Sequence, residues 1–354
     1  MSKLTKQDAV VYTNSLLHED FAKTCHGLLR GSERFEVKAV LDEKHAGKDA
    51  GDVMDGRTLG VPIFPTLASY LEKHDKPPVF VVGVAFSGGG LPESCRSEIR
   101  AAIENGMTVV CGLHDALGDD PEFNRLAKEH GVALIDIRRP RKTRDLRFWT
   151  GDILKIHAKV VPVLGTDCAV GKRTTCRILW EACNAAGIHT EMLYTGQTGW
   201  MQGYQHGFIF DATPNDFISG EIERVILECE KESRPELILI EGQGSLRNPS
   251  GPAGSEFILS GNASGVILQH YPARTHFVDQ EKIGTRVPDP VDEIELIRMY
   301  GADTLAVTLN GLGWDEEKKH AYQRELQSRL EIPVCWPIED GVDVIVPILK
   351  TLVT

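Results

Sequence analysis

A glycine-bounded turn that ends in a lysine is the segment of this sequence best suited to bind phosphate. Five residues separate Gly165 from Gly171, and Lys172 follows directly. The apolar run 159–164 predicts a buried strand before the turn, and residues 173–186 have helical character. In such a unit, backbone N–H groups, the helix N-terminus and the lysine ammonium can surround phosphate oxygens. The candidate phosphate-binding residues are Gly165, Thr166, Asp167, Gly171, Lys172, Arg173 and Thr174.

The residue after the lysine distinguishes this turn from the phosphate loop of nucleotide hydrolases. In those enzymes a serine or threonine at that position ligates Mg²⁺, whereas this chain has Arg173 there and carries its hydroxyl on Thr174. A guanidinium has no lone pair to offer a metal ion. The turn therefore predicts phosphate binding without Mg-ATP chemistry, and we expect no metal ion. The alternative is an ordinary glycine turn with a surface lysine, which the flanking strand and helix disfavour.

Polar side chains follow three further apolar runs in the second half of the chain. Glu241, His270 and Asn310 each end such a run, and Arg274 comes shortly after His270. Ligands collect at the carboxyl ends of strands in open parallel sheets. Histidine titrates near neutrality and arginine pairs bidentately with carboxylates, so this edge is a candidate active site. The structural alternatives are a surface acid at a strand end and a histidine of the core.

Eight cysteines are scattered along the chain without any Cys-x-x-Cys pair. The spacing predicts neither a zinc site nor a thioredoxin-like motif, and reduced structural thiols are the simplest interpretation. Cys168 differs because it lies in the glycine turn, near a predicted helix N-terminus. It could carry an acyl group covalently, although a small residue that fills the loop is the simpler interpretation.

Composition limits the classes of function. The chain has 354 residues, enough for two domains, and a net charge of −12. We do not expect an acidic protein of this kind to bind nucleic acid. No apolar run reaches the roughly 20 residues that span a bilayer, and the start of the chain has no apolar signal core. We expect a cytoplasmic homo-oligomer that acts on a small molecule and does not bind membranes.

Alternating strand and helix patterns predict an α/β fold in two domains. Short apolar runs alternate with helical segments over residues 1–136, which predicts a Rossmann-like parallel sheet. Its predicted ligand edge is the loop at Gly88, Gly89 and Gly90, although the dinucleotide-binding glycine spacing is absent and a flexible turn is the alternative. We divide the chain into a Rossmann-like N-terminal domain, 1–150, and a P-loop NTPase-like α/β domain, 151–354.

The junction between the domains is a basic segment, 138–147. A solvated linker is the simplest interpretation. The alternative is that Arg139 and Arg144 supply positive charge facing the phosphate turn.

These motifs resemble those of two groups of proteins. The glycine turn, Glu241 with its following glycines, and Asn310 resemble the dethiobiotin synthetase branch of P-loop proteins, from which Arg173 departs. A closer resemblance covers nearly the whole chain. It is to a bacterial and archaeal family long described only as a domain of unknown function, which includes a D-glutamate N-acetyltransferase. The segments that carry it are 86–92, 112–114, 136–140, 165–175, 195–199 and 241–245.

The closer resemblance implies transfer of an acetyl group from acetyl-CoA, the acyl donor, to the amino group of D-glutamate. The phosphate turn would then hold the phosphates of CoA, with Asn310 near the adenine. Glu241 or His270 would be the general base. Gln197 or nearby backbone N–H groups of the predicted loop 195–199 would bind the oxyanion. Arg274, with Arg286 as second choice, would bind the substrate carboxylates.

Two other classes of function remain open. One is an ATP-dependent ligase of the dethiobiotin synthetase type, which predicts Mg²⁺ dependence and ADP release; Arg173 argues against it. The other is a regulator that binds CoA or a nucleotide without turnover, against which the group of Glu241, His270 and Arg274 argues.

Overall fold

The computed structural model describes residues 5–86 and 90–354, and its contacts divide the chain into two compact units. The first unit comprises Met1–Pro140 and Gln197–Gln205, and the second comprises Arg141–Gly196 and His206–Thr354. The chain thus leaves the second unit after Gly196 and returns to it at His206. Each unit contains one six-stranded sheet in which every pairing is parallel, so the α/β prediction is confirmed.

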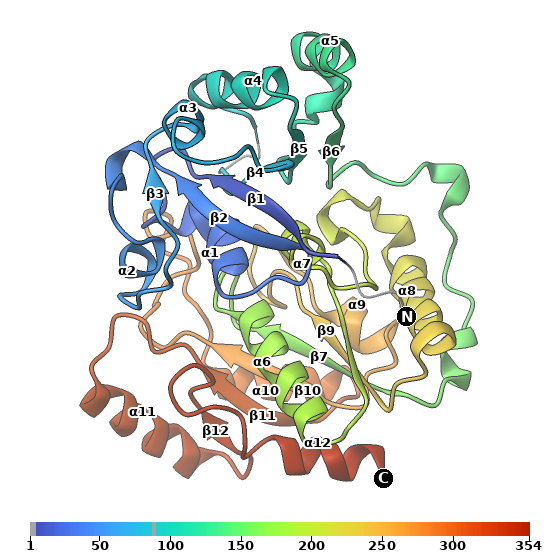
Figure 1. Cartoon of the computed structure of the whole chain (residues 1–354). Coiled ribbons are helices and arrows are strands. Elements are labelled where there is room, and N and C mark those ends of the chain that lie inside the picture. Colours follow the sequence, from blue (N-terminus) through green and yellow to red (C-terminus); the bar gives the residue numbers. More distant parts are fainter. Residues whose placement is uncertain (1–4, 87–89) are drawn as a thin grey trace. The chain divides into compact units, whose positions relative to one another are not determined.

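The sheet of the first unit has the strand order β3-β2-β1-β4-β5-β6 (Figure 1). This is the doubly wound order expected of a Rossmann-like domain. The strands are β1 (Gln7–Tyr12), β2 (Phe35–Leu41), β3 (Ile63–Phe64), β4 (Val79–Val82), β5 (Thr108–Cys111) and β6 (Leu134–Asp136).

Alternate residues of these strands enter two apolar cores, because successive side chains of a strand point to opposite faces. Val10 and Tyr12 join one core with helices α3 (Leu67–Leu71), α4 (Arg96–Glu104) and α5 (Pro121–His130). Ala9 and Val11 join the other core with helices α1 (Lys23–Leu29), α2 (Ala50–Met54) and α7 (Gln197–Gln202). Both faces of the sheet are therefore covered, as a parallel sheet requires.

Helix α7, Gln197–Gln202, corrects the prediction that the segment 195–199 is a loop. Its Met201 is fully buried in the core of the first unit, and the guanidinium of Arg34 lies 3.9 Å from the ring centroid of Trp200. Thr198 lies 3.2 Å from Thr24 through their hydroxyl oxygens. A six-residue helix is too short to show a 3.6-residue pattern. Packing against residues more than 150 positions away stabilises it.

The sheet of the second unit has the order β12-β11-β10-β7-β9-β8. Helices α8 (Ile218–Ser233), α9 (Ser255–Leu259), α10 (Pro290–Met299) and α11 (Glu316–Arg329) contribute to one large core against it. Helix α6 (Lys172–Ala185) contacts β7, β8 and β9, and α12 (Val346–Val353) contacts α6 (Figure 1). The strands are β7 (Lys159–Gly165), β8 (Thr190–Leu193), β9 (Leu237–Glu241), β10 (Val266–His270), β11 (Thr304–Leu309) and β12 (Val334–Cys335).

Strand β7 lies between the two strands that end in Glu241 and His270. Val163 of β7 is opposite Glu241 of β9, and Gly165 of β7 is opposite Gln269 of β10. The glycine turn that follows β7 is therefore flanked by the carboxyl ends of β9 and β10. The register of three neighbouring strands brings the predicted residues to one sheet edge.

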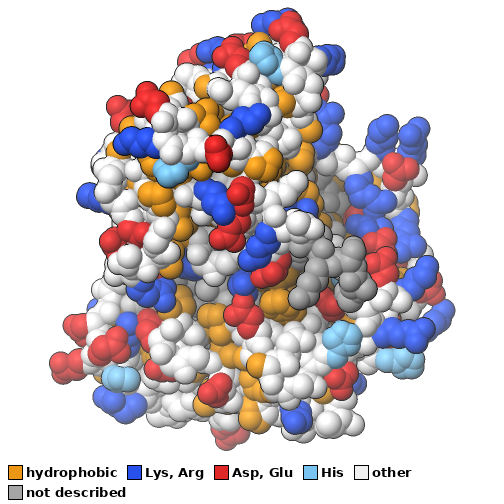
Figure 2. All heavy atoms as spheres, in the orientation of Figure 1, with side chains coloured by type: hydrophobic (Ala, Val, Ile, Leu, Met, Phe, Trp, Pro, Cys, Tyr) orange, Lys and Arg blue, Asp and Glu red, His pale blue; other side chains and the backbone are white. Residues whose placement is uncertain are grey.

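Acidic and basic side chains are interspersed over much of the face shown in Figure 2. Within residues 5–86 and 90–354, no helix combines the length and the apolar character needed to cross a bilayer.

Candidate functional site

The glycine turn closes around the ammonium group of its own lysine. Lys172 is buried, and its Nζ donates hydrogen bonds to the carbonyl oxygens of Asp167 and Gly244, each at 2.8 Å. Gly171 has a φ of 110° directly before α6, a conformation that strongly favours glycine. The first turn of α6 leaves backbone N–H groups without helical acceptors. A buried positive charge and a helix N-terminus thus meet at the turn, which is the electrostatic requirement of an anion site.

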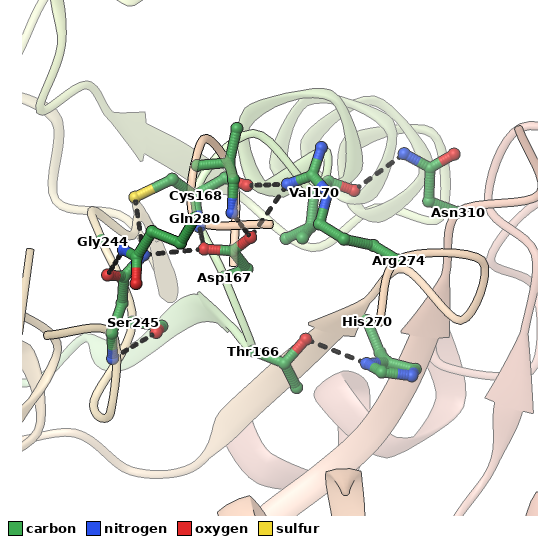
Figure 3. A network of polar contacts seen from close by, with 12 residues as sticks. Thr166, Asp167, Cys168, Val170, Gly244, Ser245, His270, Arg274, Gln280 and Asn310 are labelled. Carbon is green, nitrogen blue, oxygen red and sulfur yellow. Dashed lines mark hydrogen bonds and ion pairs between the residues drawn. The ribbon is translucent and has the colours of Figure 1, made fainter. Parts of the chain in front are cut away.

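Asp167 holds the turn in shape (Figure 3). Its side chain is fully buried and accepts four hydrogen bonds at 2.6 to 3.0 Å. The donors are the backbone N–H groups of Cys168 and Val278, Nδ2 of Asn248 and Nη1 of Arg274. A carboxylate that accepts so many hydrogen bonds organises the loop, whereas its charge would repel a phosphate. Whether Asp167 contacts a ligand stays a prediction.

Arg274 contacts two residues of the turn. Its Nη1 donates to Oδ2 of Asp167 at 3.0 Å and to the carbonyl oxygen of Cys168 at 2.6 Å. Its guanidinium also lies 5.0 Å from the ring centroid of Tyr271. Arg286, the second residue predicted to bind substrate carboxylates, is exposed. The carboxylate-binding roles of both arginines stay predictions, and the contacts of Arg274 assign it a further role in supporting the loop.

The end of β9 combines a buried carboxylate with a guanidinium. Oε1 of Glu241 lies 4.0 Å from Nη1 of Arg173, and Oε2 accepts a hydrogen bond from the backbone N–H of Thr195 at 3.3 Å. Burial raises the pKa of Glu241, while Arg173 and the backbone N–H of Thr195 lower it and only partly offset that rise. A carboxylate with a raised pKa is better matched to a proton transfer near neutral pH.

This pair does not fit a Mg²⁺ ion. In nucleotide hydrolases the cation is held by the hydroxyl directly after the lysine and by an acidic residue at a strand end. Here the residue directly after Lys172 is Arg173, and its guanidinium pairs with the strand-end Glu241. A fixed positive side chain stands beside the carboxylate that would have to ligate the metal.

The end of β10 carries a neutral histidine. His270 is buried, and its Nδ1 lies 2.9 Å from the hydroxyl oxygen of Thr166 (Figure 3). Burial lowers the pKa of His270 to about 4, because the imidazolium loses its hydration. The imidazole is therefore uncharged near neutral pH and has little affinity for a further proton. Its contact with Thr166 supports the glycine turn.

Asn310 also reaches the turn, together with a residue that sequence reasoning missed. Nδ2 of Asn310 donates to the carbonyl oxygen of Val170 at 3.0 Å, and Nε2 of Gln269 donates to the same oxygen at 3.2 Å. Oε1 of Gln269 accepts from the hydroxyls of Thr175 and Thr308, each at 2.6 Å. A signal for Gln269 was present, because a glutamine inside an apolar strand needs buried partners.

Two more buried residues that sequence reasoning missed brace the turn from the loops after β9 and β10. Asn248 donates to Asp167 and accepts from Nε2 of Gln280 at 2.9 Å. Both side chains are buried. No local pattern marks either residue, because their partners are distant in the sequence.

Thr174 is half-buried on the first turn of α6, and Cys168 is half-buried in the turn itself.

Gln197 belongs to the first unit. Its Oε1 accepts a hydrogen bond from Nη2 of Arg138 at 2.9 Å, and it begins α7. Its predicted role at an oxyanion stays a prediction.

Of the two arginines of the basic junction segment, Arg139 pairs with Asp119 at 2.6 Å in the first unit. The exposed Arg144 in the second unit lies 3.8 Å from Asp145. Gly88 and Gly89 of the predicted N-terminal ligand loop lie outside the described residues.

Comparison with known proteins agrees with this architecture. Residues 147–346 match the family described as "Domain of unknown function (DUF1611_C) P-loop domain". Residues 43–140 match its companion, described as "Domain of unknown function (DUF1611_N) Rossmann-like domain". The chain belongs to the DUF1611 family. The resemblance inferred from the motifs is thereby confirmed, as are a Rossmann-like N-terminal domain and a P-loop C-terminal domain.

Proteins similar in sequence to this DUF1611 chain include some whose names state an activity. A D-glutamate N-acetyltransferase of Pseudoalteromonas sp is 33% identical over 274 residues, which cover 75% of this chain and 80% of that protein. A D-glutamate N-acetyltransferase of Tritonibacter scottomollicae is 29% identical, covering 74% of this chain and 78% of that protein. The crystal structure of a DUF1611 family protein from Anabaena variabilis aligns with a TM-score of 0.89 at 27% identity, over 98% of this chain and all of that one.

Proposed function

We propose that this protein is an N-acetyltransferase that moves the acetyl group of acetyl-CoA to the amino group of D-glutamate. The observation that carries the proposal is the Arg173–Glu241 pair beside the glycine turn and its buried Lys172. Such a turn suits the phosphates of CoA, which bind without a catalytic metal. The names of the two relatives support the same reaction.

In the proposed reaction Glu241 is the general base. The ammonium group of the amino acid gives a proton to the Glu241 carboxylate, and the neutral amine attacks the thioester carbonyl carbon. The C–N bond forms, the C–S bond breaks, and the sulfur leaves as a thiolate that takes up a proton. The nitrogen loses its second proton, so the products are the N-acetyl amino acid, CoA with a free thiol, and one proton for the solvent.

The residues around Glu241 would set the proton affinity of its carboxylate. The raised pKa of the buried carboxyl strengthens it as a base relative to an exposed glutamate, and Arg173 lowers that pKa, which favours the ionised form. The residues of the turn that would hold the donor are Gly165, Thr166, Gly171, Lys172, Arg173 and Thr174. Backbone N–H groups after β8 are our candidates for oxyanion donors.

The test is release of free thiol from acetyl-CoA with D-glutamate, run beside L-glutamate, without ATP and without Mg²⁺. We expect thiol release with the D-isomer and one equivalent of N-acetyl-D-glutamate. ADP release that requires Mg-ATP and a carboxylate, with no thiol release, would replace the proposal with a ligase. Tight binding of acetyl-CoA without turnover of any amino acid would replace it with a regulator.

A further inference from the structure

A charged pocket in the first unit has no role in the chemistry derived above. It has a volume of about 490 Å³ and opens at the carboxyl ends of β5 and β6. Its lining includes His114 and Asp115 after β5, and Asp136, Arg138 and Arg139 at and after β6. All of these residues except Asp115 fall in the segments 112–114 and 136–140. The volume is within the range of small-molecule sites, and this edge is where parallel sheets bind ligands.

The charges of the lining suit a zwitterion better than a phosphate. Three arginines and four aspartates line the pocket, which gives the lining a formal charge of −1 with histidine neutral. A phosphate dianion would face four carboxylates, whereas a molecule with both an ammonium and carboxylates can complement both signs. The charged residues are Arg96, Arg138, Arg139, Asp115, Asp119, Asp120 and Asp136.

Two of the four aspartates use their carboxylates for hydrogen bonds and an ion pair within the fold. Asp136 accepts from the backbone N–H groups of Leu117 and Gly118 at 2.8 and 2.9 Å. Asp120 caps the N-terminus of α5 and pairs with Arg96 at 2.8 Å. These carboxylates shape the wall.

Asp115 differs from these two aspartates. Its Oδ2 accepts from the backbone N–H of Leu91 at 2.8 Å, and its Oδ1 has no donor among the residues that the structure describes. Its side chain is exposed at the pocket. An ammonium group at this oxygen would gain a charge-assisted hydrogen bond.

Arginines supply the complementary charge. Arg139 uses only Nη2 for Asp119 and Asp136, at 2.6 and 3.9 Å, and its other N–H groups have no acceptor within the described part of the chain. Arg138 is held in place by the carbonyl oxygen of Gly112 at 2.6 Å and by Gln197. One guanidinium is therefore fixed at the pocket, and a second has donors to offer a carboxylate.

We propose that this pocket binds a free α-amino acid with a second carboxylate. Its ammonium lies on Asp115, and one of its carboxylates lies on Arg139, near the positive charge of the fixed Arg138 guanidinium. The choice of D-glutamate as the probe rests on the function proposed above, whereas the assignment of an acidic amino acid rests on the pocket itself.

The test measures by calorimetry the affinity of the full chain for two ligands, D-glutamate and glutarate. The two differ by the ammonium group. CoA, which cannot transfer an acetyl group, is present throughout. We expect the wild type to prefer D-glutamate to glutarate. Asp115→Asn should weaken D-glutamate tenfold or more and leave glutarate unchanged or tighter, so that the preference disappears. Arg139→Ala should weaken both ligands tenfold or more.

A matched control and a separate measurement keep the outcomes distinct. Arg57→Ala removes an exposed arginine of the same unit that pairs with Asp55 at 2.7 Å and does not line the pocket, so it should change neither affinity. Wild-type affinity for D-glutamate in both pocket variants overturns the proposal, as does a wild type that binds CoA but not D-glutamate. Failure of the wild type to bind CoA overturns the proposed function instead, and D-glutamate binding still decides the pocket.

Discussion

The strands on either side of β7 both end in a buried titratable residue, and burial acts on the two in opposite directions. Desolvation disfavours whichever form is charged. It raises the pKa of Glu241 on β9 and lowers the pKa of His270 on β10 to about 4. The carboxylate gains proton affinity and the imidazole loses it. Two residues that look equivalent as candidate bases thus differ in proton affinity, and the difference favours Glu241 as the proposed base.

Their neighbours reinforce this difference. At the end of β9, Arg173 lies beside the carboxylate, so the local charge is balanced across a site that can accept a proton. At the end of β10, His270 contacts Thr166 and Arg274 contacts Asp167 and Cys168, so the polar groups there hold the glycine turn. We infer that the β9 end performs chemistry and the β10 end maintains the loop.

The largest expected effect separates the two ends directly. Glu241→Gln removes the proton acceptor with little change in shape, and kcat for thiol release should fall about 10²- to 10⁴-fold. His270→Gln should lower kcat by less than about tenfold, because a neutral imidazole of low basicity contributes little to proton transfer. Equal losses in the two variants would contradict the division of roles.

The second effect concerns the loop support after β10. Arg274→Ala leaves the fully buried carboxylate of Asp167 without its cationic partner, which should cost about 3 to 5 kcal/mol of unfolding free energy. Urea denaturation measures it. Arg286→Ala, at an exposed arginine of the same segment, should change stability by less than about 0.5 kcal/mol. A small loss in Arg274→Ala would show that the loop does not depend on this pair.

The third effect is a pH-dependent stability at His270. Its folded pKa of about 4 lies below the ordinary value of about 6.5, so the unfolded chain takes up a proton first as the pH falls. Stability from the neutral imidazole is complete above about pH 6.5, and about 3 kcal/mol of it is lost towards pH 4. His270→Gln should abolish this component of the pH dependence, whereas His189→Gln, at an exposed histidine, should not. Parallel pH profiles of wild type and His270→Gln would refute it.

The smallest effect concerns the charge beside Glu241. Arg173 lowers the pKa of this carboxyl, so Arg173→Ala should raise it further. Because the base must be ionised, activity falls as the pH decreases through this pKa. The acidic limb of the kcat/KM profile should therefore move to higher pH in Arg173→Ala. Arg173→Lys retains a positive charge and should move the limb less. An unmoved limb in Arg173→Ala would separate Arg173 from the base.

Sequence patterns were sufficient to predict those strands and helices that depend on residues close together in the chain. The strand and the helix on either side of the glycine turn were predicted within one residue, because an apolar run and a 3.6-residue period are local properties. Helix α7 was predicted as loop, since six residues with two glutamines and a glycine carry no such period. Its contacts with Thr24 and Arg34 are what order it.

The candidate site was predictable in its membership but not in its roles. Position at or just after a predicted strand end marked Glu241, His270, Arg274 and Asn310 as candidates. Asn248 and Gln280 gave no signal, because each is defined by a partner in another loop. The support that Arg274 gives to Asp167 was equally invisible, since 107 positions separate the two residues.

The sequence by itself determined the fold class, the two kinds of domain, the glycine turn between strand and helix, and the arginine that stands where nucleotide hydrolases have a metal-binding hydroxyl. These follow from residue type, spacing and periodicity. Only the tertiary structure showed which strand-end residue gains proton affinity from burial and which ones hold the loop. The physical reason is that proton affinity depends on desolvation and on charges within a few ångströms, and the groups that supply both come from distant parts of the chain.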